Sequence, residues 1–462
     1  MRPATHSDAA ALAAPAHRAY VGRLAEERER LGEAIARFGV PLDDDAGRAS
    51  RVAALRERVI ALGAHERNGG CALTAGALSP ACARCATGHR SISTFATLAC
   101  PRGCWFCFNP NQHDWDRYRD SAKDWRGELS AYAEATGGID CAALTGGEPL
   151  LLADEALAFC AWTRERYPHA HIRMYTSGLG ATPGLWAQLA AAGLDEVRLS
   201  VKVDEGETAV AEALGHVAAA VEAVPAVIVE MPVIPGTGPA MERLLSELER
   251  LGAFGVNLLE LCFPLHNAAA FRERGLRLAR DPFRVPYDYG YAGALPVAGS
   301  EELALELMAR ALEDGTALGL HWCSLENKNT AQIWAQNNGG ALAVPPWRFS
   351  SRTFFYEAAR AFGEDAARLA AWLREDGADD EAWSWDEEAG VVLADPAAAG
   401  AALMRRGGAG ALGRLFVASA LIERDEENRR VFREVGLHVA EEADLTRAPL
   451  AGPAAEEGAD RW

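Results

Sequence analysis

The sequence predicts an α/β fold: a partial (β/α)6, TIM-like barrel with a helical N-terminal extension and a small C-terminal α/β domain. Three observations predict it. From about residue 90, short apolar or β-branched runs alternate with amphipathic segments, and this rhythm is typical of parallel sheets with right-handed crossovers. Before residue 65 apolar residues follow helical spacing, and after Thr330 the pattern changes again. At about 100–200 residues per domain, 462 residues allow such a division.

The N-terminal extension is expected to comprise residues 1–88. Apolar residues recur at intervals of three, four and seven in the segments that begin at Leu24 and Val52, which predicts two amphipathic helices. A cysteine-rich loop is expected to follow them and to lead into the barrel.

The barrel is expected to comprise residues 89–330. Six runs are its predicted strands: Ser93–Ala99, Cys141–Leu144, Ile172–Thr176, Val197–Val201, Ala226–Met231 and Val256–Cys262. Leu318–Cys323 could add another strand. Helices are predicted near 119–136, 154–166, 184–192, 208–223, 239–252 and 301–316. In such folds the chemistry takes place at the carboxyl ends of the strands, so we expect the site there.

The C-terminal domain is expected to comprise residues 331–462. Helices are predicted at Phe354–Phe362 and Asp365–Glu375, and strands at Val391–Leu393 and Leu415–Ile422. This mixture predicts a small, separate α/β domain.

The charge of the chain excludes some partners. The sequence has 46 basic and 65 acidic residues, for a formal net charge of −19. Nucleic acids and anionic membranes bind clustered Lys and Arg, so neither is expected as a partner. No stretch approaches the roughly 20 apolar residues of a membrane span, and the N-terminus is a poor signal peptide. We therefore expect a soluble, cytoplasmic protein.

The ten cysteines are unevenly distributed. Six fall within 37 positions: Cys71, Cys82, Cys85, Cys100, Cys104 and Cys107. In a chain without an export signal, such spacing indicates metal or redox chemistry rather than disulfides. The CxxxCxxC segment from Cys100 to Cys107 follows the first predicted strand, and its thiolates can hold three irons of a [4Fe–4S] cluster. The fourth iron is then left for a substrate or cofactor. A zinc site with a distant fourth ligand is the alternative.

This segment resembles the defining motif of the radical S-adenosylmethionine (SAM) superfamily, and the resemblance covers roughly Ser91 to Ser324. It implies that Cys100, Cys104 and Cys107 ligate the cluster and that Phe106 packs near the adenine. It also implies an enzyme whose open iron binds SAM and whose cluster receives an electron from a flavodoxin- or ferredoxin-type donor. Reductive cleavage of SAM would give a 5′-deoxyadenosyl radical, which abstracts a hydrogen from the substrate.

A second motif, Thr145-Gly-Gly-Glu-Pro149, directly follows the second predicted strand. Two glycines there let the backbone approach a ligand closely, and Glu148 can accept a hydrogen bond from an ammonium group. Taken alone, the segment is equally consistent with a bare turn. It resembles the superfamily's GGEP motif, which implies that Gly146, Gly147, Glu148 and Pro149 bind the methionine amino group.

Two further strand ends resemble SAM contacts. Thr176 and Ser177, at the end of the third strand, resemble the segment that contacts the ribose. Ser200 and Lys202 share one face with Arg198, because alternate residues of a strand point the same way. They resemble the ribose and carboxylate contacts. The alternative for each is an ordinary strand end.

The remaining clustered cysteines predict a second metal site. Cys71, Cys82 and Cys85 need a fourth ligand, for which Cys323 is the first choice because it ends a predicted strand at the same barrel rim. Cys262 is the second choice. We expect an auxiliary [4Fe–4S] cluster, with a structural zinc ion as the alternative.

The substrate is the least determined part of the prediction. Asn109, Glu260 and His321 are candidate substrate contacts, because they lie near the cluster loop or at strand ends. The acidic charge favours a small polar or cationic natural-product intermediate, such as an aminosugar in antibiotic biosynthesis. Radical dehydration by a lyase or oxidation by an oxidoreductase would both fit. A peptide-modifying enzyme is one alternative, and a non-catalytic iron–sulfur or zinc protein is another.

Overall fold

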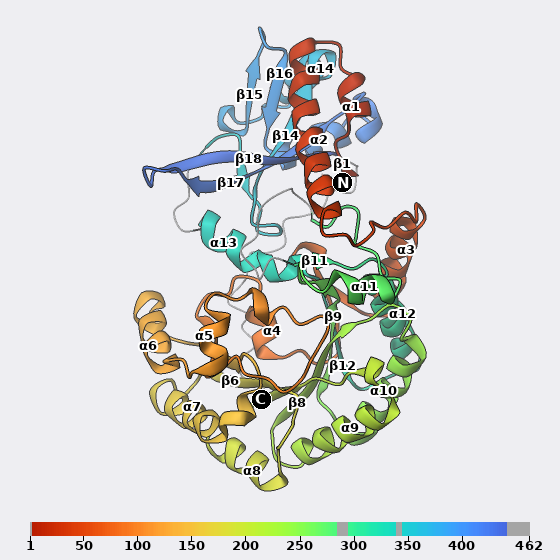
Figure 1. Ribbon diagram of the computed structural model, residues 1–462. Coiled ribbons are helices and arrows are strands. Elements are labelled where there is room, and N and C mark those ends of the chain that lie inside the picture. The colour runs from red at the N-terminus through yellow and green to blue at the C-terminus, as the bar shows by residue number, and fades with distance from the viewer. Residues whose placement is uncertain (1, 284–293, 339–343, 441–462) are drawn as a thin grey trace. The chain divides into compact units, whose positions relative to one another are not determined.

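The computed structural model describes residues 2–283, 294–338 and 344–440. The chain divides into two compact units (Figure 1). The barrel unit comprises Phe38–Pro282 and Gly290–Ala331. The sheet unit comprises Met1–Arg37, Phe283–Tyr289 and Gln332–Trp462. The N-terminal extension contributes residues to both units. The predicted domain bounds 1–88, 89–330 and 331–462 stay a prediction.

Among the described residues, the barrel unit contains a nine-stranded sheet in the order β2-β3-β12-β9-β8-β7-β6-β5-β4. The parallel strands are β4 (Ser91–Phe95), β5 (Cys141–Thr145), β6 (His171–Thr176), β7 (Glu196–Leu199), β8 (Ala226–Val233), β9 (Gly255–Glu260) and β12 (Gly319–Cys323). β3 (Ala72–Ala75) and β2 (His65–Arg67) continue the sheet in antiparallel fashion. Because β4 and β2 are the two ends of this order, the sheet is open. The predicted partial barrel is therefore confirmed, and each predicted strand, including Leu318–Cys323, overlaps a strand of the structure.

Helices cover the outer face of this sheet (Figure 1). They are α6 (Trp125–Thr136), α7 (Ala153–Arg166), α8 (Pro183–Ala191), α9 (Glu207–Val221), α10 (Gly238–Leu251) and α12 (Ser300–Glu313). Alternate strand residues such as Val227, Val229 and Met231 join the apolar faces of these helices in one buried core. Shorter elements of the unit are α4 (Pro80–Arg84), α5 (Trp115–Asp120), β10 (Cys262–Phe263), α11 (Ala268–Glu273) and β11 (Leu295–Pro296).

The inner face of the sheet is polar. The other alternate residues of the strands are buried there, among them Arg173 on β6, Arg198 on β7 and His321 on β12. The connection from β3 to β4 reaches this face, because Ser79 Oγ donates to Glu196 Oε2 at 2.5 Å. Ser79 also caps α4 by accepting from the backbone N–H of Ala81 at 3.2 Å. The cysteine-bearing helix α4 is thus held against the inside of the barrel.

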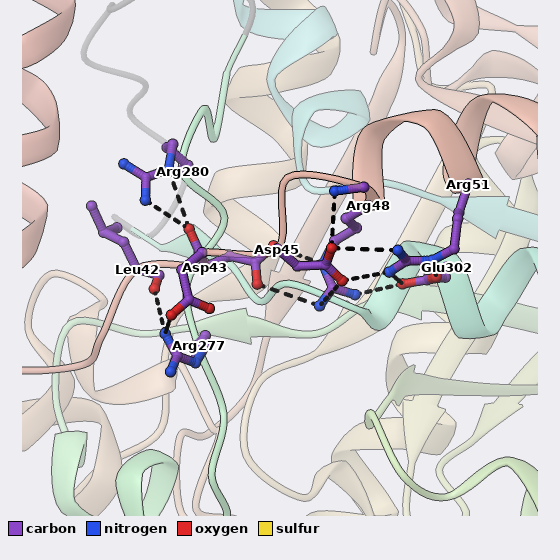
Figure 2. A network of polar contacts seen from close by, with 10 residues as sticks. Leu42, Asp43, Asp45, Arg48, Arg51, Arg277, Arg280 and Glu302 are labelled. Carbon is purple, nitrogen blue, oxygen red and sulfur yellow. Dashed lines mark hydrogen bonds and ion pairs between the residues drawn. The ribbon is translucent and has the colours of Figure 1, made fainter.

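Ion pairs fasten the segment before α3 (Arg48–Ala61) within the barrel unit (Figure 2). Arg48 contacts Asp43 at 2.7 Å and Glu302 of α12 at 2.5 Å. Arg51 also reaches Glu302, at 2.5 Å. This network places α3 on α12 and explains why this part of the N-terminal extension belongs to the barrel unit.

The sheet unit contains, within its described ranges, an antiparallel sheet in the order β1-β18-β17-β14-β16-β15, with β13 paired to β14. Its strands are β1 (Arg2–Pro3), β13 (Arg348–Phe349), β14 (Tyr356–Phe362), β15 (Trp383–Asp386), β16 (Val391–Ala394), β17 (Phe416–Arg424) and β18 (Arg430–Val439). α2 (Pro15–Ala36) packs on one face, and α14 (Gly363–Glu375) and α15 (Pro396–Met404) pack on the other. Two further helices are α1 (His6–Ala10) and α13 (Thr330–Asn338), the latter at the junction of the two units along the chain.

One secondary-structure prediction was wrong. The segment Phe354–Phe362 does not form a helix, because Tyr356–Phe362 is strand β14 at the centre of the sheet. Its Ala, Glu and Arg residues favour helix, but pairing with β16 and β17 overrides that weak preference. None of the described helices is both long and apolar enough to cross a membrane.

Candidate functional site

The CxxxCxxC segment forms a loop beyond the carboxyl end of β4. Leu98 N donates to Tyr118 O at 2.8 Å, and Cys107 N donates to Cys104 O at 3.1 Å, so the loop is held at its start and folded back at its end. Cys100 is exposed, and Cys104 and Cys107 are half-buried. Burial raises the pKa of the Cys107 thiol, and the nearby Cys104 and Cys100 raise it further. The three sulfurs therefore lie in one neighbourhood.

The two glycines of the second motif pack against this loop. Gly147 N donates to Thr97 O at 3.0 Å, and Glu148 N donates to Ala99 O at 2.8 Å. A Cβ atom on Gly147 would lie 2.0 Å from Ala99 O, and one on Gly146 would lie 2.5 Å from Thr97 O. Gly146 also has a φ of +109°, which L side chains rarely adopt. Only glycine allows this contact between the loops after β4 and β5.

Glu148 joins the end of β5 to the end of β6. Its buried carboxylate accepts from Leu150 N at 3.1 Å and from Thr176 Oγ1 at 2.5 Å. Ser177 donates to the other oxygen through its N at 2.8 Å and its Oγ at 2.6 Å. A carboxylate has about four lone-pair sites, and these four donors use them. In this arrangement Glu148 positions Thr176 and Ser177. Its contact with SAM stays a prediction.

Asn109 links the cluster loop to the glycine motif. Its Nδ2 donates to Gly146 O at 2.6 Å, and its Oδ1 accepts from Gln112 Nε2 at 2.8 Å. The amide is thus engaged by the protein on both sides. We infer a positioning role for Asn109, while its contact with a substrate stays a prediction.

Lys202 supplies a buried cation beside the cluster loop, and its ammonium group forms an ion pair only at long range. Its side chain is 9% exposed, and its Nζ has no hydrogen-bond partner in the described part of the chain. The nearest carboxylate oxygen, on Glu205, lies 3.6 Å away. The charge of Lys202 lowers the pKa of Cys100 and Cys107, although burial raises both, so the ammonium group lies near these sulfurs. A buried ammonium group without a hydrogen-bond partner is suited to bind a ligand carboxylate.

Two polar contacts join the cluster loop to the loop after β7. Arg102 forms an ion pair with Glu205 at 3.2 Å, and Trp105 Nε1 donates to Asp204 at 2.8 Å. Phe106 meets Trp105 edge-on, with ring centroids 5.1 Å apart. Ser200 belongs to the same region, since its N donates to Thr176 O at 3.1 Å. The predicted SAM contacts after β4, β5, β6 and β7 are therefore neighbours.

A second group of sulfurs gathers around Asn327. Asn327 Nδ2 donates to Cys323 Sγ at 3.2 Å and to Cys85 Sγ at 3.7 Å. Arg198 Nη2 donates to Cys82 Sγ at 3.2 Å. Burial raises the pKa of the Cys82 thiol, but the charges of Arg198 and His321 outweigh this effect and lower it to about 7. Burial raises the pKa of the Cys323 thiol and the nearby Cys85 and Cys82 raise it further, so the three cysteines are neighbours.

Cys71 lies beside this group along the backbone, because Ser324 N donates to Cys71 O at 3.1 Å. Cys262, the second choice as a fourth ligand, lies near Lys328, as Cys323 does. Burial raises the pKa of its thiol, Lys328 lowers it and Cys107 raises it. The role of Cys262 as a ligand stays a prediction.

The two other candidate substrate contacts lie apart from each other. His321 is buried on the inner face, with Nδ1 3.2 Å from Asn257 Oδ1. Glu260 Oε2 accepts from Leu325 N at 2.8 Å. Burial and the nearby Glu301 raise the pKa of Glu260 to about 8. Neither placement tests a substrate role.

Sequence reasoning assigned no role to Asn327 or Asn257, although both contact cysteine sulfurs. These asparagines reach the cysteines only through the tertiary fold. No motif or residue spacing in the sequence could have predicted these contacts. In the ranges that the structure describes, no three His, Cys, Asp or Glu side chains converge as ligands of a single metal ion do.

Comparison with protein-family models matches residues 95–248 to the radical SAM superfamily. These residues, about a third of the chain, form a radical SAM domain. Members use a [4Fe–4S] cluster and SAM, and the donor set present here fits both. Three cysteine sulfurs lie together, and backbone at Gly146 and Gly147 packs against their loop. Lys202 offers an ammonium group that has no hydrogen-bond partner in the described residues.

Among curated proteins, the chain is similar to the PqqA peptide cyclase of Methylocella silvestris. The two are 34% identical over 116 residues, which are 24% of this chain and 29% of the cyclase. The chain thus matches less than a third of that relative's length.

Solved structures give weaker likenesses. Streptococcus suis SuiB bound to precursor peptide SuiA matches with a TM-score of 0.37 and 13% identity, covering 54% of this chain and 52% of SuiB. The coproporphyrinogen III oxidase HemN from Escherichia coli, whose structure is described as that of a radical SAM enzyme, matches with a TM-score of 0.34 and 15% identity. That match covers 52% of this chain and 57% of HemN. The assignment of the radical SAM domain therefore rests on the sequence match and the motifs.

Proposed function

We propose that the protein is an enzyme that cleaves SAM reductively and uses the resulting 5′-deoxyadenosyl radical to abstract a hydrogen atom from its substrate. The observation that carries the proposal is the direct packing of the CxxxCxxC loop on the Gly146–Gly147 backbone, next to the Lys202 ammonium group, which has no hydrogen-bond partner in the described residues. This arrangement brings a site for three irons and a site for an amino acid's carboxylate together.

Each residue has a distinct task in this proposal. Cys100, Cys104 and Cys107 hold three irons, and Lys202 binds the SAM carboxylate. Gly146 and Gly147 keep the backbone close enough to contact the methionine moiety. Glu148 holds the ends of β5 and β6 in register through its hydrogen bonds to Thr176 and Ser177. When bound, the cluster and SAM supply the radical, and the barrel aligns it with one substrate C–H bond.

The proposal is tested by anaerobic reconstitution, reduction with dithionite and quantification of 5′-deoxyadenosine. We expect product from the wild type and from Cys160→Ala, whose cysteine lies buried in α7 away from the site. Cys104→Ala should give none. Absence of product from the wild type, or equal product from wild type and Cys104→Ala, would support the non-catalytic alternative instead.

For the substrate, a peptide is the first candidate. The observation that favours it is the sequence match to a protein named PqqA peptide cyclase. A small cationic molecule such as an aminosugar is the second, and the net charge of −19 is its support. A lyase reaction and an oxidoreductase reaction are both compatible with either substrate.

A paired screen separates these substrates. Candidate peptides and basic aminosugars are added to reduced enzyme and SAM, and 5′-deoxyadenosine formation is measured for each. Stimulation by peptides alone supports the first candidate, and stimulation by aminosugars alone supports the second. Replacing dithionite with a flavodoxin or a ferredoxin tests the proposed electron donors, with Cys104→Ala as the control in every arm.

A further inference from the structure

The cysteines that the proposed function does not use lie inside the barrel. Cys82 and Cys85 come from α4 and the residue that follows it, on the connection that crosses the inner face of the sheet. Cys323 ends β12 and is buried, as is Cys82. Residues separated by about 240 positions in the chain thus bring three sulfurs to one polar interior.

The surroundings of these sulfurs are unusual for neutral thiols. Besides the contacts from Asn327 and Arg198, Asn257 Nδ2 lies 3.7 Å from Cys82 Sγ and Asn68 Nδ2 lies 3.9 Å from Cys85 Sγ. A thiol sulfur is a weak acceptor, so a neutral thiol gains little from such donors. A metal-bound thiolate is a far better acceptor, and hydrogen bonds to it tune the metal.

Arg198 is oriented toward this site by two carboxylates. Its Nε donates to Glu196 at 2.6 Å, and its Nη1 donates to Glu230 at 2.7 Å, which aims Nη2 at Cys82. Asn257 donates to the same Glu230 at 2.6 Å. Nearby, the buried Arg173 has an Nη1 without a hydrogen-bond partner in the described residues. Arg198 therefore presents a guanidinium N–H to Cys82 Sγ, which favours a thiolate there.

Two of the sulfurs share a hydrogen-bond donor, the side-chain amide of Asn327. Cys85 and Cys323 both lie within reach of Asn327 Nδ2, and no group of three described ligands converges as it would on one ion. A cluster takes each cysteine on a different iron, so its sulfurs stand farther apart than the ligands of a single tetrahedral zinc. The amide donors to Cys85 and Cys323 and the guanidinium group at Cys82 favour a centre made of thiolates rather than of neutral thiols.

We propose that Cys82, Cys85 and Cys323 ligate a second [4Fe–4S] cluster inside the barrel, with Cys71 as the fourth ligand and Arg198 as the residue that balances the cluster's charge. This inference is independent of SAM cleavage, because none of these residues belongs to the CxxxCxxC loop or the glycine motif.

The test removes the first cluster so that only the second is counted. The triple variant Cys100→Ala/Cys104→Ala/Cys107→Ala is reconstituted anaerobically, and iron, sulfide and zinc are quantified. We expect about four irons and four sulfides per chain, with an electron paramagnetic resonance (EPR) signal after reduction. Adding Cys323→Ala or Cys71→Ala should lower the iron content, whereas adding Cys160→Ala should not. Circular dichroism and gel filtration of each variant verify folding.

Arg198 is tested by redox titration of the same triple variant. Arg198→Gln should move the reduction potential to more negative values, because a nearby positive charge stabilises the reduced, more anionic cluster. Arg198→Lys should restore part of the shift. Asn327→Ala, which removes the donor to two sulfurs, should shift the potential in the same direction by an independent route.

Several results would overturn the proposal. Iron near zero in the triple variant, or one zinc per chain without sulfide, excludes the second cluster. Unchanged iron on adding Cys71→Ala excludes that residue as the fourth ligand. An unchanged potential in both Arg198→Gln and Asn327→Ala excludes the roles of these side chains. All of these outcomes leave the SAM cleavage proposal unaffected.

Discussion

Replacing Gly147 with alanine should disrupt the site although the added group is a single methyl. The Cβ atom would lie 2.0 Å from Ala99 O, 2.5 Å from Ala99 C and 2.6 Å from Leu98 C. All three contacts are backbone atoms of the cluster loop, so no side-chain rotation can relieve them. Either the loop or the strand end must move.

The size of the effect follows from what that movement breaks. The hydrogen bonds from Gly147 N to Thr97 O and from Glu148 N to Ala99 O are lost or weakened. A buried unmade hydrogen bond costs about 1–3 kcal/mol, and overpacking adds about 1–3 kcal/mol. We therefore expect Gly147→Ala to lose about 2–6 kcal/mol, concentrated in the loop that carries Cys100.

The assay compares iron content, SAM-dependent 5′-deoxyadenosine formation and thermal midpoint in wild type, Gly147→Ala and Gly215→Ala. Gly215 lies within α9, where a Cβ atom meets nothing within 4 Å, so its replacement should stabilise the protein by roughly 0.5–1 kcal/mol. Gly147→Ala should reduce iron binding and product strongly. Full iron content and wild-type activity in Gly147→Ala would refute the close packing described for this loop.

Three further perturbations test other parts of the site. Glu148→Gln replaces an acceptor of four hydrogen bonds with a group that must also donate. We expect the free energy of unfolding, measured in urea, to fall by about 2–4 kcal/mol. The control Glu165→Gln changes an exposed side chain and should change this free energy little. Lys202→Met should raise the KM for SAM about tenfold or more at unchanged iron content, and an unchanged KM would remove Lys202 from the carboxylate site. Burial raises the pKa of Glu260 from 4.5 to about 8, so the folded chain retains a proton that the unfolded chain releases, and stability falls as pH rises through that window. Glu260→Gln should abolish this loss, so its unfolding free energy relative to wild type should increase by about 2–4 kcal/mol from about pH 5 to pH 8. A pH-independent difference would contradict the buried, protonated Glu260.

The barrel could be predicted from the sequence because its signals are local. Each predicted strand is a short apolar run, and buried parallel strands have that composition whatever their neighbours are. The same reasoning gave the wrong result for Tyr356–Phe362. Its Ala, Glu and Arg residues favour helix, and only pairing with β16 and β17 makes it a strand. β3 escaped prediction for a related reason, because its four residues lie beside cysteines and glycines typical of a loop.

The site was predictable where a motif is contiguous in the chain. Cys100, Cys104 and Cys107 lie within one loop, so their spacing alone indicates a shared ligand. The contacts of Asn327 with Cys85 and Cys323 depend on how β12 and α4 meet inside the barrel, which no local pattern encodes. Glu148 could be recognised as important from its motif, but its four hydrogen bonds could not be foreseen.

The central claim is that Cys100, Cys104 and Cys107 hold a cluster with one iron open to SAM. EPR spectroscopy of the dithionite-reduced protein, with and without SAM, tests it most directly. In the wild type, SAM should change the spectrum of the reduced cluster, and in Cys100→Ala/Cys104→Ala/Cys107→Ala any remaining signal should not respond to SAM. A wild-type spectrum that SAM leaves unchanged, or a response that persists in the triple variant, would contradict the claim.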